Sequence, residues 1–206
     1  MYGRGRVQVV AMALVILIGS AGVAAAQGSG LEMWLSGGVQ GLNENDTAVP
    51  DAAVNIPLVA SIGYPLSSRF TVEGEFAWMV PLEQSMDIGS GNTGDYKSPD
   101  VLSYQASLRA NFGTGAWRPY LVVGAGAATF LENSDADRMP ALSESETTFA
   151  ANLGAGVTYL LSPRWSLRAD ARGLVAFPSD DSVLAQDGEA DEVWMERGTI
   201  GFGYHF

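Results

Sequence analysis

Charged side chains stand two residues apart at several places in this chain. Glu73 and Glu75 form one pair, and Arg168, Asp170 and Arg172 form a run of three. Carboxylates and guanidinium groups in this pattern support proton transfer, an ion path or mutual pairing in a protected interior. On a β-strand, a spacing of two places side chains on one face. The elements that carry these residues therefore decide between the three kinds of chemistry.

Eight strands are expected to position the charged residues, and no long stretch has helical spacing. Most of the alternating segments reach ten residues or more. A strand of a soluble protein usually has about 5–6 residues, whereas a strand tilted across a bilayer needs about 9–11. The expected strands are 31–41, 55–65, 69–80, 101–112, 117–131, 147–161, 164–177 and 193–206.

The connections between these strands alternate strictly between short and long. The short ones read PLSSR, GTGA and LSPR, which are rich in the Gly, Pro and Ser of tight turns. The long ones cover 42–54, 81–100, 132–146 and 178–192. Antiparallel neighbours would collect all the short turns at one end, as in barrels that span an outer membrane.

The two faces of the strands differ in a way that favours lipid outside. In 101–112, Leu102, Tyr104 and Leu108 oppose Ser103 and Arg109. A soluble, lipocalin-like barrel with an apolar core is the alternative. A membrane barrel gives the aromatic residues at strand ends a place at the interface, and it gives the inward glycines a narrow lumen. The sequence therefore predicts an all-β protein, an eight-stranded antiparallel up-and-down transmembrane β-barrel.

The N-terminus predicts export. Arg4 and Arg6 precede an apolar run over 7–18, and Ala24-Ala25-Ala26 follows. This pattern is typical of a secretory signal peptide over 1–26, which leaves a barrel domain over 27–206. A retained membrane anchor is the alternative, although the apolar run is shorter than the ~20 residues of a spanning helix.

Together these segments resemble the OmpA-like and OmpX-like outer membrane β-barrel family. The resemblance rests on the signal peptide, the eight strands, RPYLVVGAGAATF, NLGAGVTYLLSPRWSLRADARG and the terminal GFGYHF. It implies a place in the cell outer membrane, among its lipid and lipopolysaccharide. It also implies that Phe202, Tyr204 and Phe206 are the signal read by the barrel assembly machinery. The peptidoglycan-binding domain of full-length OmpA-type proteins does not follow Phe206, so tethering to the cell wall is not implied.

Alternation places four acids and four arginines on the lumen face. They are Glu32, Glu73, Glu75, Arg109, Arg168, Asp170, Arg172 and Arg197. An eight-stranded barrel is just wide enough for side chains to fill, so a paired network that plugs the lumen is favoured over an ion path or gate. Four inward residues, Trp34, Pro57, Val59 and Met79, are candidates for an apolar transport pocket or for ordinary packing.

The long connections hold 18 of the 23 carboxylates, against only Lys97 and Arg138. A solvated surface is the simplest interpretation of these acids. Two others are a docking surface for a basic partner and divalent-cation binding through carboxylate oxygens. The cation candidates are Asp135, Asp137, Asp180 and Asp181. The net charge of −12 argues against nucleic acid as a partner.

An enzyme is not expected, and no cofactor is implied. Cysteine is absent, and His205, near the end of the last strand, is the sole histidine. The sequence favours a structural and surface-interaction role, with membrane integrity or adhesion through the acidic loops. A small-molecule channel or a lateral transporter of small hydrophobic solutes is the alternative.

Overall fold

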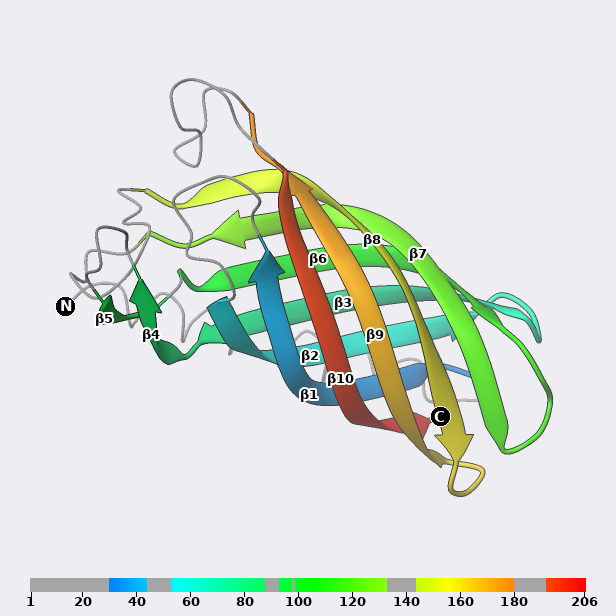
Figure 1. Cartoon of the computed structure of the whole chain (residues 1–206). Helices are drawn as coiled ribbons and strands as arrows, with labels where there is room; N and C mark the ends of the chain where they lie inside the picture. Colours follow the sequence, from blue (N-terminus) through cyan, green and yellow to red (C-terminus); the bar gives the residue numbers. More distant parts are fainter. Residues whose placement is uncertain (1–29, 44–52, 88–92, 98, 133–143, 180–191) are drawn as a thin grey trace.

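The alternating segments form the eight strands of a closed antiparallel barrel in the computed structural model (Figure 1). The structure describes residues 30–43, 53–87, 93–97, 99–132, 144–179 and 192–206. The barrel strands are β1 (Glu32–Asn43), β2 (Ala53–Pro65), β3 (Phe70–Pro81), β6 (Val101–Asn111), β7 (Trp117–Phe130), β8 (Glu146–Leu160), β9 (Trp165–Phe177) and β10 (Val193–His205). Their bounds lie within two residues of the expected ones, and the predicted fold class is confirmed.

The first and last strands close the barrel. β1 pairs with β10 from Glu32 opposite His205 to Asn43 opposite Trp194. The order around the barrel is β1-β10-β9-β8-β7-β6-β3-β2. Because each of these strands has a hydrogen-bonded neighbour on both sides, no strand edge is left for lipid to meet.

The connections define two ends of the barrel. Residues 66–69, 112–116 and 161–164 join strands at the short-turn end, where β1 begins and β10 ends. The opposite end receives the long connections and is called the long-loop end. No helix among the described residues has the length and apolarity of a membrane span.

A small hairpin interrupts the segment expected to be a loop over 81–100. β4 (Glu83–Asp87) pairs with β5 (Thr93–Lys97), with Glu83 opposite Lys97 and Asp87 opposite Thr93. Both strands have five residues and mixed polar sequence. Because their sequences do not alternate apolar and polar residues, they lack the period-two pattern that identifies the barrel strands.

Alternation along the strands separates an apolar exterior from a filled interior. Ile200 and Phe202 expose 70% and 62% of their surface, whereas Thr199 and Gly201 between them are buried. The inward set includes 19 buried polar or charged residues, Glu73 and Arg172 among them. A soluble barrel has the reverse arrangement, so its apolar residues would be the buried ones.

Candidate functional site

An apolar cluster fills the lumen at the long-loop end. Its members are Met79, Val101, Ala128, Phe130, Ala150, Leu174, Ala176, Val193 and Met195, all at most 4% exposed. Pairing aligns them across the strands, with Met79 opposite Val101 and Val101 opposite Phe130. On the other side of the barrel, Met195 lies opposite Leu174.

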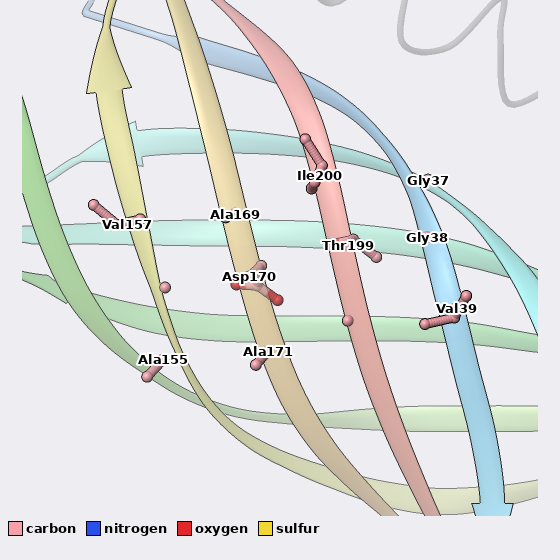
Figure 2. Close-up of a pocket in the computed structure, with 12 residues that line it drawn as sticks. Gly37, Gly38, Val39, Ala155, Val157, Ala169, Asp170, Ala171, Thr199 and Ile200 are labelled. Atoms are coloured by element: carbon pink, nitrogen blue, oxygen red, sulfur yellow. The ribbon is translucent and has the colours of Figure 1, made fainter.

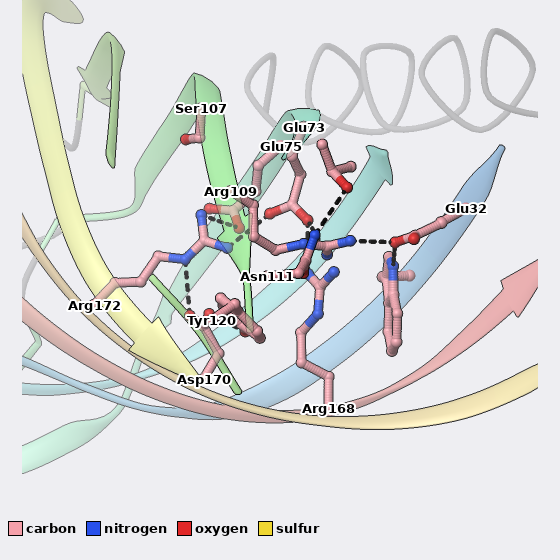
Figure 3. A network of polar contacts seen from close by, with 12 residues as sticks. Glu32, Glu73, Glu75, Ser107, Arg109, Asn111, Tyr120, Arg168, Asp170 and Arg172 are labelled. Carbon is pink, nitrogen blue, oxygen red and sulfur yellow. Dashed lines mark hydrogen bonds and ion pairs between the residues drawn. The ribbon is translucent and has the colours of Figure 1, made fainter. Parts of the chain in front are cut away.

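A charge network fills the lumen towards the short-turn end, and Glu73 is its centre (Figure 3). Its Oε2 lies 3.1 Å from Arg109 Nη1 and 2.8 Å from Arg168 Nη1. Its Oε1 lies 2.7 Å from Arg172 Nη2. One fully buried carboxylate on β3 therefore holds three guanidinium groups from β6 and β9.

Arg172 links Glu73 to the two other acids at mid-height. Its Nη1 lies 3.1 Å from Glu75 Oε2, and its Nε donates to Asp170 Oδ1 at 2.8 Å. Arg197 Nη2 lies 2.5 Å from Glu75 Oε1. The hydroxyl of Tyr120 donates to the other oxygen of Asp170 at 2.5 Å (Figure 3).

Glu32 terminates the network at the short-turn mouth. Its Oε2 accepts from Arg109 Nη2 at 2.5 Å and from Trp34 Nε1 at 3.1 Å. The guanidinium carbon of Arg168 lies 3.9 Å from the centre of the Trp34 ring, which is a cation–π contact. The Trp34 indole thus contacts the network on the side nearest the short-turn end.

The structure brings all eight predicted lumen charges into this one network. Each side chain is at most 15% exposed, and most are below 5%. Charges taken out of water require partners, because the desolvation of each ion costs several kcal/mol. Four carboxylates facing four guanidinium groups meet that requirement, and the arrangement is suited to filling the lumen.

Neutral polar side chains lie between the two layers. Asn152 Nδ2 donates to Gln105 Oε1 at 2.9 Å and to Ser107 Oγ at 3.2 Å. Gln40 Nε2 donates to the sulfur of Met79 at 2.8 Å, where the polar layer meets the apolar cluster.

Two inward glycines make room for the largest lumen side chains. A Cβ on Gly203 would lie about 2.5 Å from the Trp34 ring, and one on Gly156 would meet the phenol ring of Tyr120. Real Cβ atoms do not approach other heavy atoms that closely. Glycine at these positions therefore lets each ring lie over the neighbouring strand, because Trp34 is paired with Gly203 and Tyr120 with Gly156.

A family model for an outer membrane protein β-barrel domain matches residues 11–206. The chain belongs to this family of outer membrane barrels.

Neisserial surface protein A shares the fold of this outer membrane barrel, and two further solved structures match the chain at lower TM-scores. Neisserial surface protein A matches with a TM-score of 0.58 at 15% identity, over 86% of this chain and 98% of that one. Ail of Yersinia pestis, solved with the heparin analogue sucrose octasulfate, gives 0.49 at 18% identity, over 85% and 99%. OprG of Pseudomonas aeruginosa gives 0.49 at 15% identity, over 85% and 95%. No curated protein matches the chain.

Membership in the family orients the barrel in the membrane. Outer membrane barrels have short periplasmic turns and longer outside loops, so the short-turn end is periplasmic and the long-loop end extracellular. Exposed aromatic residues gather at both ends, as interfacial girdles do. They are Tyr64, Phe70, Phe112, Trp117 and Trp165 at the periplasmic end, and Tyr104, Phe149, Phe177 and Trp194 towards the extracellular end.

The predicted assembly signal lies on the outer face of β10 and at the chain end. Phe202 is exposed, while Tyr204 and Phe206 are half-buried. The ring of Tyr204 contacts those of Trp165 and Phe206, with 5.0 Å between ring centres in each case. The role of these residues in assembly stays a prediction.

Sequence reasoning missed a Ser–His–Glu alignment at the periplasmic mouth. Ser166 Oγ lies 2.7 Å from His205 Nε2, and His205 Nδ1 lies 3.9 Å from Glu32 Oε1. The second distance exceeds a hydrogen bond. Glu32 is already bound by Arg109 and Trp34, and Ser166 is fully buried. The alignment is therefore suited to packing the mouth.

The four candidates for an apolar transport pocket are all buried, but they lie in different surroundings. Trp34 contacts Glu32 and Arg168 in the charge network. Met79 belongs to the apolar cluster. Pro57 lies opposite Met79, and Val59 lies opposite Ala77. The cation candidates Asp135, Asp137, Asp180 and Asp181 lie outside the described residues, which hold no group of three potential metal ligands.

The outer wall over β1, β10, β9 and β8 has a shallow hollow of about 680 Å³ (Figure 2). Its outward residues are mostly small, such as Gly37, Ala169 and Ala171, and Val39 and Ile200 stand higher around it. The hollow faces the acyl chains of the membrane.

Towards the extracellular end of this wall, Glu196 points outward with Gly41 and Gly173 opposite it.

Proposed function

We propose that this outer membrane barrel is a closed, non-enzymatic protein with a structural and surface-interaction role. Membrane integrity and adhesion through the acidic extracellular loops are the functions that this architecture suits best. The observation that carries the proposal is the filling of the lumen by two consecutive layers. The apolar cluster lies at the extracellular end, and the charge network lies towards the periplasm.

The distribution of acids supports contact through the loops. Of the 23 carboxylates, 18 lie in the four long connections as the sequence bounds them, 42–54, 81–100, 132–146 and 178–192, and four more are paired in the charge network. The extracellular surface is therefore strongly anionic. A basic partner, or a divalent cation that bridges to a second anionic surface, is the chemistry that fits such a surface.

Conductance measurements separate the closed barrel from a channel. We expect the purified full chain in planar bilayers to give no stepwise openings, because both layers would have to move before ions could pass. Double substitution of Met79 and Met195 by alanine removes side-chain volume from the apolar cluster alone. This variant should also show no stepwise conductance, because the charge network still fills the lumen. Stable openings of the unmodified protein would contradict the plug and favour the channel alternative.

Adhesion is tested on whole cells that carry the barrel on their surface. Cells with the full chain should bind a polylysine-coated surface more strongly than cells whose barrel has asparagine at Asp135, Asp137, Asp180 and Asp181. Equal surface levels are checked by labelling the exposed loops. If a barrel with shortened loops binds as strongly as the full chain, adhesion does not depend on the loops and the proposal fails.

A further inference from the structure

Two periplasmic turns share one construction. Leu66-Ser67-Ser68-Arg69-Phe70 joins β2 to β3, and Leu161-Ser162-Pro163-Arg164-Trp165 joins β8 to β9. In each, the serine hydroxyl accepts from the backbone N–H of the arginine and of the aromatic residue, at 3.1 to 3.3 Å. In each, the leucine N–H donates to the aromatic carbonyl at 2.9 Å. Arg69 and Arg164 therefore occupy equivalent positions within their turns, each directly before the aromatic residue.

These two hairpins lie on opposite sides of the barrel, four strands apart in the order around the wall. The third short turn lies between them and joins β6 to β7. At its end, Arg118 follows Trp117 at the start of β7, where it is half-buried and its Nε donates to the carbonyl of Gly115 at 3.3 Å. Each short connection thus has one arginine next in sequence to an exposed aromatic residue, with Arg69 and Arg164 exposed and Arg118 half-buried, and the three are distributed around the periplasmic end.

The three turn arginines differ from the other arginines of the barrel strands. Each of the four lumen arginines forms an ion pair, whereas Arg69, Arg118 and Arg164 form none with any described residue. Among the described residues at this end, Glu32 is the acidic side chain, and it is bound by Arg109. Among the described side chains, Arg69, Arg118 and Arg164 therefore have no acidic partner, on a protein whose net charge is −12.

The neighbouring aromatic residues place these cations at the height of the lipid headgroups. Phe70, Trp117 and Trp165 are 45%, 64% and 51% exposed and mark the end of the apolar band. Interfacial aromatic residues lie at headgroup level, and an arginine beside them can extend its guanidinium to the same plane. Guanidinium groups bind phosphate through two parallel hydrogen bonds, which a lysine cannot reproduce.

We propose that Arg69, Arg118 and Arg164 form an arginine rim that binds the phosphate headgroups of anionic phospholipids in the periplasmic leaflet. The turn hydrogen bonds fix the backbone of two of the three residues, so the cations are presented in place before lipid arrives. Each cation near an anionic membrane surface strengthens binding roughly fivefold.

Quenching of the rim tryptophans by brominated lipid tests the proposal. For this experiment, Trp78 and Trp194 of the full chain are replaced with phenylalanine. The remaining tryptophans are Trp117 and Trp165 at the rim and Trp34, which is buried in the lumen. It is refolded into phosphatidylcholine vesicles that contain a fixed fraction of phosphatidylglycerol, with only one of the two lipids brominated. We expect brominated phosphatidylglycerol to quench several-fold more per molecule than brominated phosphatidylcholine.

The same measurement on rim variants decides whether the arginines are responsible. Triple substitution R69Q/R118Q/R164Q should remove the preference, while R69K/R118K/R164K should keep part of it as the matched control for charge. The heat-dependent gel mobility of the closed barrel checks that each variant is folded. A glutamine variant with the preference of the parent protein would overturn the proposal. So would equal quenching of the parent protein by the two brominated lipids while inorganic phosphate alone changes the fluorescence of the rim tryptophans, because the rim would then bind the free anion and not the lipid headgroup.

Discussion

Replacing Glu73 with alanine should lower the free energy of unfolding by about 3–5 kcal/mol, because it leaves buried charge without its partner. Glu73 is fully buried and is the shared partner of Arg109, Arg168 and Arg172. Arg168 has no other ion pair among the described residues and would keep only its contacts with aromatic rings. Unfolding by urea of the barrel refolded in lipid vesicles, followed by gel mobility, measures the effect.

Two further substitutions make this measurement specific. Glu73→Gln keeps the size and an acceptor oxygen but loses the charge, so its effect should lie between the parent and Glu73→Ala. Glu196→Ala is the matched control, because Glu196 is a carboxylate on the outer wall with glycines opposite it. Its effect should be within about 1 kcal/mol of zero. Equal effects of Glu73→Ala and Glu196→Ala would mean that water screens the lumen charges, and an ion path would regain support.

Alternation alone places the charged residues on the lumen face, and this much follows from the sequence. Glu73 and Arg172 are both inward because each strand has a period of two and one apolar face. Their contact does not follow, since the two residues are 99 positions apart and meet only when the barrel closes. The choice of Glu73, rather than Glu75, as the shared partner depends on the stagger of the closed barrel.

The residues that sequence reasoning missed lie where the alternation of apolar and polar residues does not distinguish the two faces of a strand. β7 is apolar on both faces, so its inward Tyr120 gave no sign that it would bind Asp170. Most of the apolar cluster is missed as well, because the residue type of Phe130 or Val101 does not show whether the side chain faces lipid or lumen. A buried apolar layer and a lipid-facing one have the same composition, and only their position in the closed barrel separates them.

Deleting Phe206 should strongly reduce the amount of barrel in the outer membrane of cells while the purified chain still folds. The chain resembles barrels whose C-terminal aromatic residue is the assembly signal, and this role is a property of recognition. The structural contribution of Phe206 is small: its N–H donates to the carbonyl of Leu31 at 3.0 Å, and its half-buried ring contacts Tyr204. One such hydrogen bond contributes about 1 kcal/mol to stability. Membrane levels in cells are compared with refolding yields in lipid vesicles.

Phe112→Ala separates recognition from loss of an aromatic ring. Phe112 is 50% exposed at the same periplasmic end, and its N–H donates to the carbonyl of Pro119 at 2.7 Å. It therefore matches Phe206 in residue type, depth and backbone pairing, but it lies in a turn instead of at the chain end. The two variants should refold alike in vesicles, and only the deletion should lower membrane levels in cells. Equal losses in cells would assign the effect to the aromatic girdle, whereas unchanged levels for both would remove Phe206 from the assembly signal.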